Sequence, residues 1–277
     1  MLSLHTNAAS LSTQNSLNNV NRNLSSSMTK LGTGYRVNSA MDDAAGLQIA
    51  TRLNAQTRGM QTAQKNTQNG ISMLQTAEGA LDEINNMLLR MKDLSTEAAT
   101  ATATDDDVTA MNAEFKALKA EIDNVLNNTS FGGKELLKTG SGLLAKSVTF
   151  QIGAASGETY KFGAASGSLS GFATSISGAT GLAASGANAM IGTLDGAIKK
   201  LSTLRSDLGA AANRLEHNYN NLGNMVQNTE AARGRIMDVD YASETANMTK
   251  NQMLMQASTS MLKQSSSMSQ MVASLLQ

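Results

Sequence analysis

The sequence contains no cysteine and no proline, and its 277 residues include only five Phe, four Tyr and no Trp. Without cysteine there can be neither disulfides nor thiolate metal sites. So few aromatic side chains disfavour a fold built around one thick core. The absence of proline and the presence of 17 methionines favour long, uninterrupted helices with adaptable contacts. We therefore expect an elongated, mainly α-helical protein.

Charge and hydropathy argue against several classes of partner. Twenty-two basic residues balance 22 acidic ones without forming a basic block, so we expect neither nucleic acid nor a membrane surface as a partner. No window approaches the roughly 18 consecutive apolar residues of a membrane span, and the first thirty residues lack the pattern of a secretory signal. If the protein is exported, we expect it to use a route that does not depend on such a signal. The only two histidines, His5 and His217, have no nucleophile or metal ligand near them in the sequence, so we predict no enzyme, cofactor or metal site.

Spacing of seven predicts a long coiled-coil helix from Ile191 to Ile236. One row consists of Leu194, Leu201, Leu208, Leu215 and Leu222. A second row is expected at Ile191, Ile198, Ala212, Tyr219 and Val226. Arg205 and Arg233 fall on this second row, so each either extends its charged group outward along its stem or pairs across the seam. Both alternatives are compatible with a helix.

Two stripes in three-four alternation predict a helical hairpin. The first consists of Leu74, Ala77, Leu81, Ile84, Leu88, Met91 and Ala98. The second consists of Val108, Met111, Phe115, Leu118, Ile122 and Val125. Between them Asp105, Asp106 and Asp107 are well placed to cap a helix N-terminus and to complement its dipole.

Thinner stripes with the same spacing of seven occur near both ends of the chain. They consist of Leu17, Leu24 and Leu31 at one end and Leu254, Met261, Met268 and Leu275 at the other. The positions between them are mostly Ser, Thr, Asn and Gln, so neither stripe can offset the ordering cost of an isolated helix. We predict that each end needs a helical partner and is poorly ordered in the free monomer.

The composition shifts to Gly, Ser and Ala between residues 132 and 188. Within this region apolar residues alternate on either side of an Ala-Ala-Ser-Gly turn, which predicts a β-hairpin containing Val148, Phe150, Ile152, Tyr160 and Phe162. The remainder is predicted to be loop. No phosphate-binding glycine spacing is present, so the glycines favour a linker.

The stretch NSAMDDAAGLQIATRL (38–53) could be either a catalytic or metal site or a structural joint between helices. Two adjacent aspartates can share a proton or hold a divalent metal, but no further ligands lie nearby in the sequence. Asn38 and Ser39 can cap a helix, Asp42 and Asp43 suit a first turn, and Gly46 after two alanines allows close approach of another backbone. We interpret Asn38, Asp42, Asp43 and Gly46 as a structural joint.

Four long segments from the two ends of the chain share the pattern of one protein family. They are LGTGYRVNSAMDDAAGLQIATRLNAQTRGM (31–60), NTQNGISMLQTAEGALDEI (66–84), LGAAANRLEHNYNNL (208–222) and AARGRIMDVDYASETANMTKNQMLMQAS (231–258). These motifs closely resemble bacterial flagellin over about residues 1–135 and 188–277. The short middle and the Met- and Ser-rich C-terminal end are more like some short, lateral-type flagellins.

The resemblance implies a subunit of the extracellular flagellar filament, secreted through the flagellar type III apparatus, that polymerises with copies of itself. It also implies an export chaperone and cap or junction proteins as partners. The alternative is a hook–filament junction or needle-type protein of the same export system. The expected division is a terminal coiled-coil inner domain (1–40 with 237–277), a helical-bundle domain (41–135 with 188–236) and a short variable β and loop region (136–187). The joint would connect the first two, and the two terminal stripes would form the polymerisation seam.

One apolar residue, Leu89, lies on an otherwise polar row of the expected helix 74–98. In the resemblance, Leu89, Arg90, Leu94 and Glu114 match positions that contact Toll-like receptor 5 in many flagellins. These four residues are therefore candidate receptor contacts.

Overall fold

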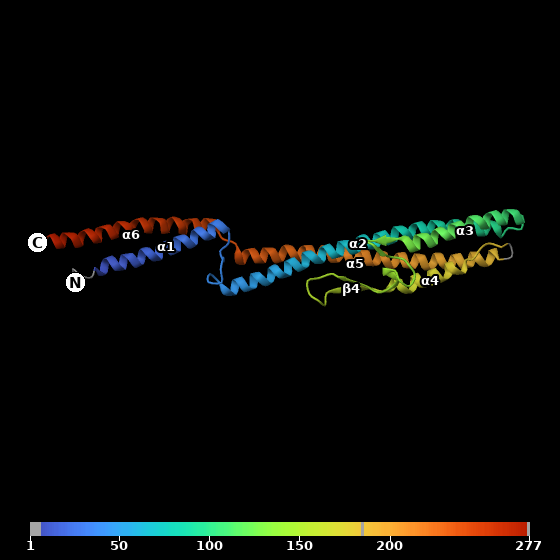
Figure 1. Ribbon diagram of the computed structural model, residues 1–277, viewed down its shortest axis with the longest axis horizontal. Helices are drawn as coiled ribbons and strands as arrows, with labels where there is room; N and C mark the ends of the chain where they lie inside the picture. Colours follow the sequence, from blue (N-terminus) through green and yellow to red (C-terminus); the bar gives the residue numbers. More distant parts are fainter. Residues whose placement is uncertain (1–6, 184–185, 276–277) are drawn as a thin grey trace. The chain divides into compact units, whose positions relative to one another are not determined.

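The computed structural model describes residues 7–183 and 186–275, which are mainly helical (Figure 1). The helices are α1 (Ala8–Thr33), α2 (Ala44–Ala98), α3 (Asp105–Asn128), α4 (Ala164–Gly178), α5 (Ala187–Met237) and α6 (Tyr241–Leu275). The short elements are β1 (Ser130–Phe131), β2 (Lys134–Glu135), the 3-10 turn η1 (Leu143–Ala145), β3 (Val148–Gln151) and β4 (Thr159–Phe162). β1 pairs with β2 and β3 with β4, both antiparallel. The expected fold class, mainly helical with a small β region, is confirmed.

The chain folds as two compact units, residues 1–55 with 228–277 and residues 56–227. Helices α2 and α5 contribute residues to both units. Residues 136–187, expected as a separate variable region, belong to the second unit, where Leu136, Leu144, Phe162 and Phe172 are buried.

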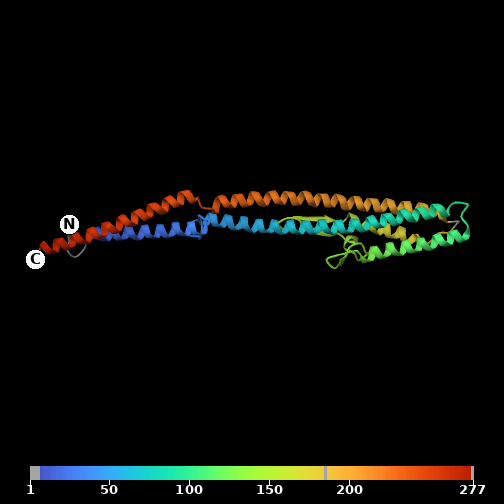
Figure 2. The ribbon, with the colours of Figure 1, turned by 90° about the horizontal axis from the view of Figure 1, so that it is seen from above.

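The first unit is built on α1 and α6, which run side by side in both views (Figures 1 and 2). Helix α1 begins at the cap residue Asn7, whose side-chain oxygen accepts a hydrogen bond from the Ser10 amide at 3.0 Å. It ends at Gly34, whose φ of 76° is the left-handed conformation that glycine adopts most readily. Its buried residues are Leu24 and Ser27 alone, so the helix contributes little apolar burial.

The second unit holds the larger core, and the three long stripes supply much of it. All seven residues of the stripe from Leu74 to Ala98 are at most 2% exposed. The five leucines of the predicted α5 row, Leu194, Leu201, Leu208, Leu215 and Leu222, are at most 4% exposed. From α3, Phe115 and Ile122 are fully buried. Each large side chain buried in this way contributes roughly 1.5–3 kcal/mol of transfer free energy. The predicted helical hairpin and long helix are confirmed.

The expected second row of α5 is wrong by one position. The buried residues are Ala197, Leu204 and Ala211, at 0, 0 and 2% exposure, which follow the row leucines by three residues rather than four. Ile198 is only half-buried and Tyr219 is 38% exposed. A leucine row at intervals of seven has apolar neighbours on both sides here, so only the position of the partner helices selects the buried side.

The middle region contains the predicted hairpin and one helix that was not predicted. β3 and β4 pair with Phe150 opposite Tyr160. The loop prediction is wrong for α4, which buries Leu169, Phe172 and Ile176 at 0–1% exposure. These three residues have helical spacing, but the surrounding Gly and Ser residues indicated a linker.

Helix α3 begins with a capping box. The Thr104 hydroxyl accepts from the Asp107 amide at 3.2 Å, while the Asp107 carboxylate accepts from the Thr104 amide at 3.1 Å and from its hydroxyl at 2.6 Å. The hydrogen bond from the Thr104 hydroxyl is the main reason that the pKa of Asp107 lies below its ordinary value. The aspartate run thus occupies the first turn, as predicted, but the cap itself is Thr104.

Candidate assembly and receptor surfaces

The Asp42 side chain organises the connection between α1 and α2. Its Oδ2 accepts hydrogen bonds from the Ser39 amide at 2.9 Å and from the Asn38 amide at 3.0 Å. These two backbone donors lower the pKa of Asp42, because they stabilise its charged form. Asn38 also donates from its side chain to the Tyr35 carbonyl at 2.9 Å. Asp42 therefore closes a turn instead of occupying the first turn of a helix.

Asp43 is the N-cap of α2. Its Oδ1 accepts from the Gly46 amide at 2.8 Å, and α2 begins at the next residue, Ala44. Gly46 is buried, and a Cβ at this position would collide with the Asp43 carboxylate. The predicted close approach at Gly46 therefore involves the capping side chain and not another backbone.

The joint also includes the segment just before α6, which was not predicted from the sequence. Tyr35 and Asp238 form an antiparallel bridge, flanked by hydrogen bonds from the Arg36 amide to the Met237 carbonyl at 2.6 Å and from the Val239 amide to the Gly34 carbonyl at 3.0 Å. The Arg36 guanidinium also donates to the Ile236 carbonyl at 2.8 Å. The joint thus ties the segment after α1 to the segment before α6. Only pairing in three dimensions shows this contact between residues 200 positions apart.

The predicted row on α1 faces α6. Leu24 is 8% exposed, while Leu17 and Leu31 are half-buried in the same row. These three residues of α1, which repeat every seven positions, are therefore shielded from solvent on the helix that packs against α6.

The predicted row on α6 does not face α1. Leu254, Met261 and Met268 are 42, 63 and 49% exposed, and the side chain of Leu275 lies outside the described part of the chain. Among the α6 side chains that the structure describes, the half-buried ones are Glu244, Met248, Asn251, Met255, Ser258, Leu262, Ser265 and Ser267. Met248, Met255 and Leu262 among them also repeat every seven residues, one position after the predicted row. Helix α6 therefore carries two apolar rows, and the one expected to pair with α1 lies on the surface.

The exposed row is part of a wider apolar stripe. Met253 and Met271 are 61 and 56% exposed, and at about 100° per residue they fall within about 100° of Leu254, Met261 and Met268 around the helix. Within α6 only Glu244, Lys250 and Lys263 carry charge. We call the five exposed residues Met253, Leu254, Met261, Met268 and Met271 the α6 stripe.

A bidentate ion pair lies on the outer surface of the second unit. Arg90 of α2 donates from Nε and Nη2 to the two carboxylate oxygens of Glu114 of α3, at 2.8 and 3.1 Å. Their side chains are 53 and 45% exposed, and Leu89 beside them is 46% exposed. The hydrogen bond to Glu114 is the main reason that the pKa of Arg90 is raised. Three of the four predicted receptor residues thus lie together at the surface.

The fourth, Leu94, lies in the core. It is 2% exposed and belongs to the same apolar cluster as Leu88, Met91 and Ala98. Its position continues the buried stripe of α2, so Leu94 does not share the exposed surface of the other three residues.

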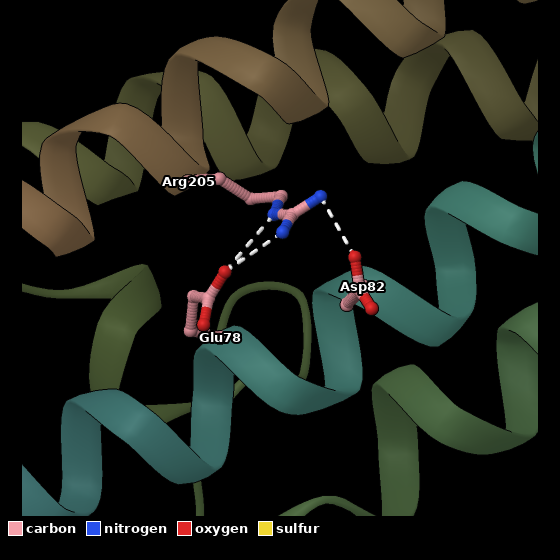
Figure 3. Close-up of polar contacts among 3 residues, drawn as sticks. All are labelled: Glu78, Asp82 and Arg205. Atoms are coloured by element: carbon pink, nitrogen blue, oxygen red, sulfur yellow. Dashed lines mark hydrogen bonds and ion pairs between the residues drawn. The ribbon is translucent and has the colours of Figure 1, made fainter.

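Arg205 pairs across the α2–α5 seam, which decides between the two alternatives for this residue (Figure 3). Its Nη2 and Nε lie 2.8 and 3.2 Å from Oε1 of Glu78, and its Nη1 lies 3.0 Å from Oδ1 of Asp82. The two carboxylates are four residues apart on α2 and so share one helix face. In the first unit, Arg233 donates to the Asn54 side chain at 3.2 Å.

Neither a metal cluster nor a membrane span occurs in the described part of the chain. Among residues 7–183 and 186–275, no group of three or more His, Cys, Asp or Glu residues is placed to hold a metal ion. The described helices include none that is both long enough and apolar enough to cross a membrane.

Long helices that bury apolar rows against one another, with a short antiparallel bridge between two connecting segments, are typical of a structural helical protein. The chain matches the bacterial flagellin N-terminal helical region over residues 4–141 and the bacterial flagellin C-terminal helical region over residues 191–276. It is 39% identical to a flagellin of Halalkalibacterium halodurans over 249 residues, 90% of each chain. It is 38% identical to a flagellin of Bacillus subtilis over 299 aligned positions, 98% of each chain.

A crystal structure of Bacillus cereus flagellin is also similar. The TM-score is 0.51 at 37% identity, over 57% of this chain and 88% of that one. The chain belongs to the bacterial flagellin family. It is a structural subunit that polymerises with copies of itself into the extracellular flagellar filament.

Proposed function

We propose that the α6 stripe and the row on α1 together form the polymerisation seam, and that a second copy of this chain covers the α6 stripe. The stripe exposes large apolar side chains whose burial against a neighbour is worth roughly 1.5–3 kcal/mol each before the costs of association. Its helix carries only three charges, so a similarly uncharged surface of another copy suits it better than a charged partner.

The joint has the role of holding this assembly unit together. Asp42, Asp43 and Gly46 shape the start of α2, while Tyr35 and Asp238 tie the two connecting segments to each other. Subunit packing requires that α1 and α6 arrive as one pair, because a row on either helix alone is too thin. In this proposal the joint sets that pairing.

The flagellar type III apparatus exports the chain unfolded, with an export chaperone before assembly and cap or junction proteins at the growing end. Two properties support this proposal. No disulfide or proline constrains the chain, and α1 buries only Leu24 and Ser27, so the first unit costs little to unfold. Its exposed α6 stripe is a surface that a chaperone would cover in the free monomer.

Electron microscopy of the purified protein under polymerising conditions tests the assembly proposal. Met261→Glu should abolish filaments, because it places a charge in the buried seam. Gln256→Glu is the matched control, since Gln256 is exposed on α6 about 140° around the helix from Met261. A variant lacking residues 255–277 should keep the circular dichroism of the second unit and form no filaments. Filaments of normal length from Met261→Glu would refute the proposed seam. A parent protein that forms no long filaments would support the junction-protein alternative.

We propose a second role, recognition by Toll-like receptor 5 through Leu89, Arg90 and Glu114. The supporting observation is an arginine held bidentate by a carboxylate beside an exposed leucine, a composition typical of interface hot spots. Holding the guanidinium in place also reduces the entropy lost on binding.

Receptor signalling by the monomer and filament formation should be measured in parallel for Arg90→Ala. We expect signalling to fall about tenfold or more with the fold intact, since Arg90 lies outside the core. Glu114→Ala should act more mildly. Lys92→Ala is the matched control, because it removes another exposed ion pair of α2, to Asp195 at 2.6 Å. Unchanged signalling by folded Arg90→Ala would remove this surface from receptor recognition.

A further inference from the structure

The described methionines range from fully buried to fully exposed, and the exposed ones are most numerous on α6. Three in the core of the second unit are buried, namely Met60, Met73 and Met91, at 1, 5 and 0% exposure. Four on α6 are exposed, namely Met253, Met261, Met268 and Met271, at 61, 63, 49 and 56%. All four belong to the α6 stripe. The chain has no cysteine, so thioethers are its oxidisable sulfur groups.

We propose that these four methionines form an oxidation-sensitive modification site. Peroxide converts them to sulfoxides in the free subunit and thereby blocks assembly, whereas packing in the polymer shields them. This inference rests on the proposed assembly role of the α6 stripe. It adds a chemical control of that surface, one that acts on the subunit only before it is incorporated.

The chemistry is a two-electron oxidation of each thioether by hydrogen peroxide. The sulfur attacks one peroxide oxygen, an S–O bond forms and the O–O bond breaks. The departing hydroxide takes the proton of the transferred oxygen and leaves as water, so one peroxide yields one sulfoxide and one water. A methionine sulfoxide reductase reverses the change with a dithiol, which becomes a disulfide as the oxygen leaves as water.

The sulfoxide changes the surface from apolar to polar. Its oxygen is a strong hydrogen-bond acceptor, and burial against another copy leaves that oxygen unsatisfied unless the neighbour presents a donor. One unsatisfied buried acceptor weakens association by about tenfold, and four on one stripe act on the same interface. The critical concentration for polymerisation should therefore rise steeply with the number of sulfoxides.

The fold itself is protected from the same reaction. Met60, Met73 and Met91 are covered by neighbouring helices, and peroxide reaches them only when the second unit opens. Mild oxidation should thus modify the assembly surface and leave the core intact.

The test treats purified monomer with limited hydrogen peroxide and locates sulfoxides by peptide mass spectrometry. The four α6 methionines should react about tenfold or more faster than the three buried ones, with unchanged circular dichroism. The critical concentration should rise about tenfold or more and return to its initial value after treatment with reductases for both sulfoxide epimers. In preformed filaments the α6 methionines should react more slowly than in monomer.

Two variants separate the α6 site from other exposed methionines. Replacing Met253, Met261, Met268 and Met271 by Leu should make assembly resistant to peroxide, whereas Met41→Leu with Met225→Leu should leave it sensitive. If the fourfold variant does not assemble without peroxide, reversal by the reductases decides the question. Normal assembly of subunits carrying α6 sulfoxides, or equal sensitivity of an assembly-competent fourfold variant, would overturn the inference. Failure of the untreated parent to polymerise would instead contradict the assembly role.

Discussion

Two glycines of α2 provide a matched pair for measuring how tightly the β3–β4 hairpin packs. A Cβ added at Gly79 meets no atom within 4 Å, so Gly79→Ala should stabilise the second unit by about 0.5–1 kcal/mol through helix propensity alone. A Cβ added at Gly70 would lie 3.0 Å from two ring carbons of Phe150 and 3.3 Å from Leu215. The same substitution there must displace a neighbour.

Phe150 has little freedom to move away from Gly70. Its ring stacks on Tyr160 with centroids 6.3 Å apart, and the Arg214 guanidinium lies 4.6 Å above the centre of the Tyr160 ring. Overpacking of this kind costs about 1–3 kcal/mol, which offsets the propensity gain and leaves Gly70→Ala neutral or destabilising by up to about 2 kcal/mol. The two variants should therefore differ by about 1–3 kcal/mol, a gap of several degrees in Tm.

Urea unfolding followed by circular dichroism measures both free energies, and amide exchange at Ile152, which donates to the Glu158 carbonyl at 3.0 Å, reports on the hairpin. Exchange should accelerate in Gly70→Ala and remain unchanged in Gly79→Ala. In a Phe150→Ala background the two glycine variants should become equivalent, because the obstructing ring is absent. Equal stabilisation by both substitutions, with unchanged exchange at Ile152, would refute the packing argument.

Three further outcomes are expected. Arg205→Met should lower the free energy of unfolding of the second unit by only about 0.5–1.5 kcal/mol, because its two ion pairs are partly exposed. Urea unfolding should show a smaller difference between parent and variant in 1 M salt, because salt screens the ion pairs. A difference that does not depend on salt would contradict the pairing. Because the pKa of Asp42 is lowered in the folded chain, its stabilising effect should be complete above its ordinary value of 3.8 and be lost as the pH falls through the lowered value. The Tm advantage of the parent over Asp42→Asn should therefore disappear in acid, and an advantage that persists there would contradict this origin. Residues 10–30 should exchange their amides faster than residues 74–98 in monomer and become protected in filaments; strong protection in monomer would contradict the predicted weak order of the ends.

The strongest periodic stripes led directly to the observed core. The row from Leu74 to Ala98 and the leucines of α5 repeat over many turns, and any soluble fold must bury such a continuous face. The start of α3 could also be predicted in outline, because an acidic run such as the one at Asp105 is favourable in the first turn of a helix. Helix α4 was missed because its three core residues stand among Gly and Ser, whose frequency indicated a linker.

The sequence showed the rows of apolar residues on each helix, but it did not show which helix each row packs against. On α6, the rows through Leu254 and through Met248 have the same spacing, and only contact with α1 shows which of them is left on the surface. Leu94 likewise continues the buried stripe of α2, and packing places it in the core although its neighbours Leu89 and Arg90 are outside. Periodicity describes one helix at a time, whereas burial depends on where the other helices lie.

The amino-acid sequence by itself determined the mainly helical class, the long seams, the hairpin and the membership of the flagellin family. The tertiary structure alone decided the faces: the buried side of α5, the bridge between Tyr35 and Asp238, the Arg205 pairings and the exposure of the α6 stripe. The physical reason is that helix propensity and periodicity are local properties of the chain, while each of these contacts joins residues far apart in sequence. Their geometry exists only once the helices have packed.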